Sequence, residues 1–165
     1  MRSSKSQKIP SKLRSLTGLR NALWRDKRAG RKIVFTNGCF DILHVGHVEY
    51  LSKARKMGDV LVIGLNSDRS VKQLKGKDRP INREEDRSKL LSAFYFVDYV
   101  TIFNEDTPDR LIRKLKPDIL VKGGDWQMKD IVGASFVKSY GGRVATVPFV
   151  KGFSTTSLVK KMSGN

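Results

Sequence analysis

The feature that most constrains the fold of this chain is an unbroken apolar run, Val-Leu-Val-Ile-Gly-Leu, at residues 60–65. A strand with one face in water alternates apolar and polar residues, whereas a strand of a sheet covered on both faces is apolar throughout. The run is far shorter than the ~18 apolar residues that a membrane-spanning helix needs. We therefore expect a buried strand inside a parallel sheet that has helices on both faces.

Other short β-rich runs recur along the chain and alternate with helical patterns. Helices are expected from Gly46 to about Met57, from Asn82 through Phe94 with an Asn82–Glu85 capping box, from Thr107–Pro108 through Leu115, and before residues 141–142. A last helix should begin within residues 154–157, and residues 75–81 should form a mobile loop. The further strands are expected at residues 33–36, 99–103, 118–121 and 143–147. This alternation predicts an α/β fold, a Rossmann-like doubly wound sheet of five parallel strands with right-handed crossovers.

Composition narrows the class of protein. The chain has 165 residues, a formal net charge of +17 and one cysteine, Cys39, so no disulfide can form within it. We expect a basic disordered arm over residues 1–10 and a single domain over 11–165, which opens with an amphipathic helix at about 11–28 with Ser11 as a candidate N-cap. No secretory signal and no membrane segment are recognisable, which favours a cytoplasmic protein. Residues 1–32 carry +10 of the net charge, which suits either a solvated arm and surface helix or non-specific contact with nucleic-acid phosphates.

The first candidate site follows the strand at 33–36. Both histidines of the chain, His44 and His47, lie three residues apart where a helix should begin, and Gly46 between them lets a bulky anion approach the backbone. Free N–H groups at a helix start, together with two imidazoles, make an anion site. A surface pair of histidines and a metal pair with Asp41 are the alternatives.

Two further motifs fall where other strands end or the last helix begins. Ser154, Thr155 and Thr156 offer hydroxyls and N–H groups to phosphate oxygens, although Ser and Thr are also ordinary N-caps. In Lys-Gly-Gly-Asp-Trp at residues 122–126, the glycines allow close backbone approach, and the tryptophan suits either packing or stacking on a base. Neither a Walker loop nor a Gly-x-Gly-x-x-Gly fingerprint is present.

Taken together, these motifs resemble those of a known family. His-x-Gly-His and Ser-Thr-Thr are similar to the nucleotidyltransferase superfamily related to the cytidylyltransferases. Asn-Gly-Cys-Phe-Asp-Ile-Leu-His from residue 37, Leu-Asn-Ser-Asp from 65, Leu-Lys-Gly from 74, Arg-Pro-Ile from 79 and Val-Lys-Gly-Gly-Asp-Trp from 121 resemble the D-glycero-β-D-manno-heptose 1-phosphate adenylyltransferases. The resemblance runs from about residue 32 to 162.

The resemblance implies transfer of AMP from ATP to heptose 1-phosphate, which yields ADP-heptose and pyrophosphate for lipopolysaccharide precursor synthesis. It implies a homodimer, with Mg²⁺ as the cofactor held mainly by phosphates rather than by protein ligands. The catalytic residues would be His44, His47 and Lys75, with Lys72 or Lys77 as substitutes for Lys75. Nucleotide and phosphate would be bound by Thr36, Asn37, Gly38, Cys39, Phe40, Gly46, Arg87, Lys122, Gly123, Ser154, Thr155 and Thr156, and the sugar phosphate by Asp41, Asn66, Asp125 and Trp126.

Two other functions remain open at this point. A cytidylyltransferase acting on glycerol phosphate or another alcohol phosphate is disfavoured by Phe149, which stands where the glycerol-phosphate enzymes carry an arginine, and by Asn-Gly-Cys in place of a Gly-Thr pair. A nucleic-acid-binding module would use the basic arm, but no helix-turn-helix, RNA-recognition or zinc-finger motif gives it specificity, so no specific nucleic-acid partner is expected.

Overall fold

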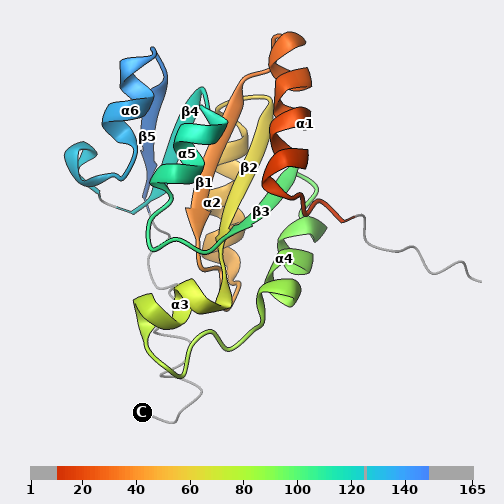
Figure 1. Ribbon diagram of the computed structural model, residues 1–165, viewed down its shortest axis with the longest axis vertical. Coiled ribbons are helices and arrows are strands. Elements are labelled where there is room, and N and C mark those ends of the chain that lie inside the picture. Colours follow the sequence, from red (N-terminus) through yellow and green to blue (C-terminus); the bar gives the residue numbers. More distant parts are fainter. Residues whose placement is uncertain (1–10, 125, 149–165) are drawn as a thin grey trace, which may run out of the picture.

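The fold is a parallel sheet with helices on both of its faces (Figure 1). The structure, a computed structural model, describes residues 11–124 and 126–148. All strand pairs are parallel, in the order β3-β2-β1-β4-β5. The strands are β1 Ile33–Gly38, β2 Val60–Asn66, β3 Tyr99–Phe103, β4 Ile119–Gly123 and β5 Arg143–Val147. The predicted α/β fold class and its five strands are confirmed.

The helices divide between the two faces of the sheet. Residues of α1, α5 and α6 pack on one face, and residues of α2 and α4 pack on the other. The bounds are α1 Leu16–Arg28, α2 Val45–Arg55, α3 Asp68–Lys75, α4 Glu84–Ala93, α5 Asp109–Leu115 and α6 Ala134–Ser139, with a short 3₁₀ turn at Met128–Asp130. None of the described helices is long and apolar enough to span a bilayer.

Burial on both faces explains the consecutive apolar residues of β1 and β2. Val34 and Phe35 are neighbours in β1 yet belong to opposite cores, and both are fully buried. In β2 the one residue without a side chain, Gly64, is needed for packing, because a Cβ atom there would lie 2.8 Å from the Phe35 ring. The Phe35 ring of β1 therefore packs directly against the backbone of Gly64 in β2, and this contact favours the observed register of the two strands.

The strand order creates a natural place for a ligand. The chain runs outward from β1 through β2 to β3 and then returns past β1 to reach β4 and β5. The connections after β1 and β4 therefore leave the sheet in opposite directions. A small crevice lies between the ends of β1 and β4, at the carboxyl edge of the sheet where α/β proteins generally bind their ligands.

The N-terminal helix is shorter than expected. It begins at Leu16, with the Ser15 side chain accepting a hydrogen bond from the Gly18 N–H, and not near Ser11. The preceding residues run extended beside β3, where Arg14 N–H donates to the Val100 carbonyl (2.8 Å) and Val100 N–H donates to the Lys12 carbonyl (3.0 Å). An unpaired strand edge competes for these backbone groups and delays the start of the helix.

Other boundaries also differ from the expectation. The Asn82–Glu85 capping box is wrong, because α4 starts at Glu84 and Asn82 directs its side chain elsewhere. Pro108 is the N-cap of α5, one residue later than predicted. Helix α3 was not predicted, since its eight residues offer too few apolar positions for a periodic pattern. The arm at 1–10 and the helix from 154–157 lie outside the described residues.

Candidate active site

The two histidines lie at the beginning of α2, just beyond the carboxyl end of β1. His44 is the N-cap residue and His47 occupies the first turn, and their ring centroids are 4.0 Å apart. Phe40 packs its ring 5.3 Å from that of His47 and holds a left-handed backbone conformation, with φ of 47°. Such a backbone is rare outside glycine and indicates a loop whose shape is imposed by its surroundings. The first turn contains no acidic residue, so anions meet no repulsion there.

Burial keeps His47 neutral. It lowers the pKa of His47 to about 4, with further lowering from the charges of His44 and Lys75. The backbone N–H of His44 donates to Nδ1 of His47 over 3.4 Å, so the ring proton of the neutral form lies on Nε2. Burial also lowers the pKa of His44. At neutral pH, His47 therefore offers one N–H donor to a ligand and no net charge.

Lysine side chains supply the positive charge around these rings. Burial raises the pKa of the Cys39 thiol, and the charges of Lys75 and Lys122 act against that rise, which brings both lysines within electrostatic reach of the β1–α2 loop. Lys75 also acts on His47, whereas Lys72 and Lys77 act on neither group. Of the three lysines considered for the phosphate role, Lys75 is thus the one the fold brings to the histidines.

Lys122 marks the other wall of the crevice. Burial lowers its pKa, its ammonium lies 3.4 Å from the Asn37 side-chain oxygen, and it lies 5.7 Å from the centre of the Trp126 ring. These three residues, with Ile131, line a small hollow of about 70 Å³ between the ends of β1 and β4. Aromatic, amide and ammonium groups together suit a nucleotide base and its phosphates.

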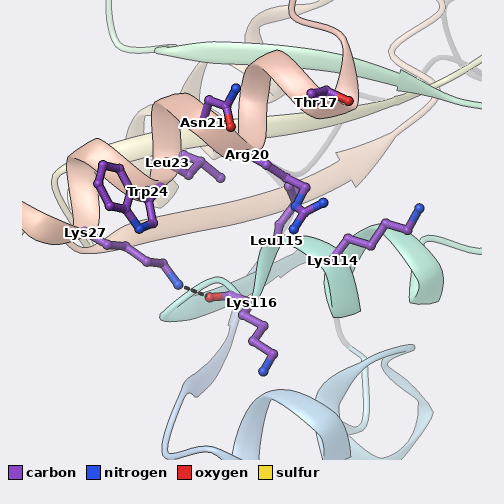
Figure 2. A pocket seen from close by; sticks show the side chains of 9 residues that line it. All are labelled: Thr17, Arg20, Asn21, Leu23, Trp24, Lys27, Lys114, Leu115 and Lys116. Atoms are coloured by element: carbon purple, nitrogen blue, oxygen red, sulfur yellow. Dashed lines mark hydrogen bonds between the residues drawn. The ribbon is translucent and has the colours of Figure 1, made fainter.

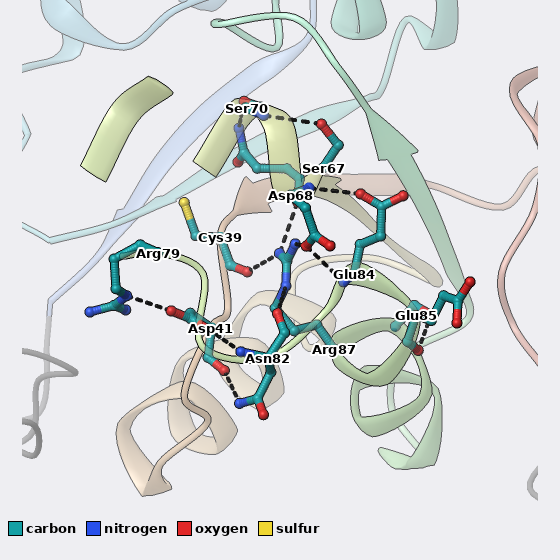
Figure 3. A network of polar contacts seen from close by, with 12 residues as sticks. Cys39, Asp41, Ser67, Asp68, Ser70, Arg79, Asn82, Glu84, Glu85 and Arg87 are labelled. Atoms are coloured by element: carbon teal, nitrogen blue, oxygen red, sulfur yellow. Dashed lines mark hydrogen bonds and ion pairs between the residues drawn. The ribbon is translucent and has the colours of Figure 1, made fainter. Parts of the chain in front are cut away.

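A buried arginine ties the surrounding loops together (Figure 3). Arg87 on α4 is fully buried. Its guanidinium donates to carbonyls after β1, at the end of β2 and in the loop before α4, and it forms an ion pair of 2.8 Å with Asp68. The carbonyl partners are Cys39 (2.6 Å), Asn66 (2.8 Å) and Asn82 (3.0 Å).

Asp41 extends this network. Its carboxylate accepts hydrogen bonds from the backbone N–H groups of Ile81 and Asn82 and forms an ion pair of 2.6 Å with Arg79. Burial by itself raises the pKa of Asp41, but these hydrogen bonds and the arginine outweigh burial and lower it. The Asn82 side chain donates to the Asp41 carbonyl. The loop between α3 and α4 is thereby held against the β1–α2 loop.

Several residues that the sequence predicts to bind ligands instead direct their polar groups at other parts of the protein in this network. The donors of Arg87 are directed at protein acceptors, Asp41 is 2% exposed, and Asn66 is buried with its amide donating to Ser70. Arg79, Asn82 and Ser70 were not predicted as site residues. Arg79 was read only as part of the Arg-Pro-Ile motif, Asn82 resembled a helix cap, and Ser70 belongs to no recognised pattern. The proposed ligand contacts of Arg87, Asp41 and Asn66 stay predictions.

The remaining predicted residues fall into three groups. Gly46 lies in the first turn of α2, and Gly38 lies beneath the Phe40 ring. Thr36 is fully buried, with its hydroxyl on Tyr50, a residue that sequence reading also missed. Asp125 and the hydroxyl motif at residues 154–156 lie outside the described residues. Among the residues that the structure does describe, no three His, Cys, Asp or Glu side chains gather as metal ligands.

A second hollow lies far from the histidines. A groove of about 590 Å³ runs between α1 and α5 (Figure 2). Trp24 is 59% exposed here, with the Arg28 guanidinium 4.8 Å from its ring. Arg20, Lys27, Lys114 and Lys116 line the groove. Part of the basic excess of the N-terminal segment is therefore displayed toward the amino ends of β1 and β4, away from the crevice.

The Arg87 network generates a stability prediction. Replacing Arg87 with Leu removes the donors from three backbone carbonyls and leaves Asp68 without its cation, so we expect a loss of ~3–5 kcal/mol in the free energy of unfolding. Urea unfolding followed by circular dichroism measures it. Lys89→Leu on the same helix, where an exposed lysine pairs weakly with Asp86, is the control and should change little. Equal effects would show that the network is unimportant.

His47 generates a pH prediction. Its folded pKa of about 4 lies below its ordinary value of 6.5, so the unfolded chain binds the extra proton between these values. The free energy of unfolding should therefore fall as pH drops from 6.5 to 4, by up to about 1.4 kcal/mol per pH unit from this group. A His47→Gln variant should lose less stability over that window, as thermal melts at several pH values would measure. If the stability of the wild type and of His47→Gln fell equally between pH 6.5 and 4, the lowered pKa of His47 would be contradicted.

Comparison with known proteins agrees with this geometry. A family model described as cytidylyltransferase-like matches residues 35–160, which include most of β1, both histidines and β4. Two curated relatives called bifunctional protein HldE are each 56% identical, from Geobacter metallireducens over 152 residues (92% of this chain) and from Campylobacter fetus over 142 residues (86%). The chain spans about a third of the length of these relatives, 31% and 30% respectively.

Solved structures give the same result. The lipopolysaccharide core biosynthesis protein from Thermoplasma volcanium is 33% identical, with a TM-score of 0.60, over 75% of this chain and all of that one. A pantoate-β-alanine ligase from Francisella tularensis, 13% identical, matches 93% of this chain and 77% of its own length with a TM-score of 0.60, which shows a shared fold only. The chain belongs to the cytidylyltransferase-like family and is a nucleotidyltransferase.

Proposed function

We propose that the chain transfers AMP from ATP to D-glycero-β-D-manno-heptose 1-phosphate, which yields ADP-heptose and pyrophosphate in lipopolysaccharide precursor synthesis. The observation that carries the proposal is the pair of histidines at the start of α2, just beyond the carboxyl end of β1 and within electrostatic reach of Lys75. The relative from Thermoplasma volcanium is a lipopolysaccharide core biosynthesis protein, which supports the biosynthetic setting. The motifs that resemble the heptose adenylyltransferases support the substrates.

The histidines would act on the triphosphate. In an in-line transfer, a phosphate oxygen of the sugar forms a bond to the α-phosphorus while the bond from that phosphorus to the β-phosphate bridging oxygen breaks. The protein must then stabilise charge that develops on the pyrophosphate, and fixed N–H donors do so without reorganisation. The Nε2–H of His47 supplies such a donor, and a bound polyphosphate would raise the low pKa of both rings toward protonation.

The lysines would balance the two anionic substrates. Lys75 approaches from the end of α3 and Lys122 from the end of β4, so their charges converge on the β1–α2 loop from two sides. ATP would enter as its Mg²⁺ complex, with the metal held mainly by phosphate oxygens.

The substrates can be tested directly. We expect pyrophosphate release when ATP is mixed with D-glycero-β-D-manno-heptose 1-phosphate and Mg²⁺, and much slower release with CTP or with hexose 1-phosphates. A coupled pyrophosphate assay over two nucleotides and a panel of sugar and alcohol phosphates measures this. Faster turnover with CTP and glycerol phosphate would replace the proposal with the cytidylyltransferase alternative.

The histidine and lysine roles give a second test. His47→Ala or His44→Asn should lower turnover by roughly 10²–10³, the usual cost of losing a preorganised donor. Lys75→Ala should also lower kcat/KM, whereas Lys72→Ala, on the same helix and likewise exposed, should leave it within about twofold. Steady-state kinetics on variants checked for folding by circular dichroism measure both. Near-normal turnover in both histidine variants would remove them from the catalytic step.

A further inference from the structure

We propose that Tyr50 is a positioning residue that locks the histidine-bearing turn of α2 onto the ends of β1 and β4, and that it acts through its hydroxyl group rather than through its ring. The part of this inference that concerns catalysis rests on the proposed function. The part that concerns the position and titration of His47 does not depend on that function. Tyr50 belongs to none of the motifs recognised in the sequence, and it touches two of them.

The contacts of the hydroxyl connect three separate elements. Tyr50 projects from the middle of α2 into the core and is 8% exposed. Its oxygen lies 2.5 Å from the Thr36 hydroxyl of β1 and donates to the Val121 carbonyl of β4 over 3.3 Å. Thr36 directly precedes the Asn-Gly-Cys segment, and Val121 directly precedes Lys122. One phenol thus joins the helix to the two strands whose ends form the crevice.

The Tyr50 hydroxyl has one proton to donate, and the Val121 carbonyl can only accept. Burial raises the pKa of Tyr50 to about 12, with partial offset by hydrogen bonds from Thr36 and from the Gly123 backbone. The phenol therefore carries its single proton at neutral pH and gives it to the Val121 carbonyl. The Thr36 hydroxyl must then donate to Tyr50. The chain of donors runs from β1 through the helix to β4, and reversing or removing one member leaves another unsatisfied.

The arrangement reaches the histidines through the helix itself. Residues three apart on an α-helix are neighbours on adjacent turns, so Tyr50 lies one turn beyond His47 on the same side of the helix. The ring of Tyr50 alone would satisfy the apolar core around Leu51 and Ala54, as a phenylalanine would. Carrying a hydroxyl into that core costs free energy unless it is hydrogen bonded. The hydroxyl is hydrogen bonded to β1 and β4, the two strands that border the crevice. These bonds fix the position of α2, and with it the first turn that carries the histidines, relative to the ends of the two strands.

The test compares Tyr50→Phe with a matched variant. Tyr140→Phe also removes a hydroxyl whose pKa burial raises to about 12 and which donates to a backbone carbonyl, that of Pro117 (2.7 Å), but it lies beyond α6, away from the crevice. The chain has two histidines, so its imidazole signals in ¹H–¹⁵N spectra can be assigned with a single His44→Gln variant. The whole chain is used throughout.

We expect Tyr50→Phe to remain folded and to move the pKa of His47 from about 4 toward 6.5, because the turn is freed to admit water. Its kcat should fall about tenfold with a change of less than about threefold in KM for ATP, as expected for a misplaced group rather than a lost binding contact. Thr36→Val, which removes the other hydroxyl of the pair, should likewise move the pKa of His47. Tyr140→Phe should lose stability without either effect.

The outcomes separate this inference from the proposed function. If the wild-type chain fails to transfer AMP, the proposed function fails, while the histidine titration still decides whether Tyr50 sets the environment of His47. An unchanged His47 pKa in Tyr50→Phe overturns the inference. So does an equal change in Tyr140→Phe, which would indicate general loosening of the fold. A pKa change with normal kcat in an active enzyme would likewise exclude a role in catalysis.

Discussion

The placement of the Arg87 guanidinium is the constraint on which the ligand-facing end of the molecule depends. A full positive charge at a fully buried position is tolerated only if its donors all find acceptors. The acceptors come from loops after β1 and β2 and from the segment before α4, so these loops must converge on one point. Asp41 then draws the same segment in from the other side. The crevice is consequently bordered by loops that are fixed before any substrate arrives.

Around this base, burial opposes the charged forms of four ionisable groups. Burial lowers the pKa values of His44, His47 and Lys122 and raises that of Cys39. An anionic ligand reverses the electrostatic balance, because it favours the protonated form of every base that it touches. Binding and protonation are therefore linked in such a site. A site of this kind gains positive charge in response to polyphosphate and does not display all of it beforehand.

The sequence predicted the fold well where the signal was local. Runs rich in apolar and β-branched residues located all five strands, and burial on both faces of the sheet accounts for neighbouring apolar residues such as Val34 and Phe35. The His-x-Gly-His spacing located the start of α2. What failed depended on partners distant in sequence: Asn82 looked like a cap but bonds Asp41, and Ser11 looked like a helix start but lies next to an extended segment paired with β3. Arg87 matched a family position, yet only the packed structure shows its carbonyl partners.

The extended segment from Lys12 to Arg14 has a consequence for the sheet as a whole. Its backbone hydrogen bonds with Val100 occupy the outer side of β3, which would otherwise present unpaired N–H and C=O groups to solvent. Exposed strand edges are where sheets of different molecules join and aggregate. By placing a few residues of its own N-terminal region there, the chain closes one side of the sheet to foreign strands. Within the described residues, β5 is left as the strand at the opposite margin.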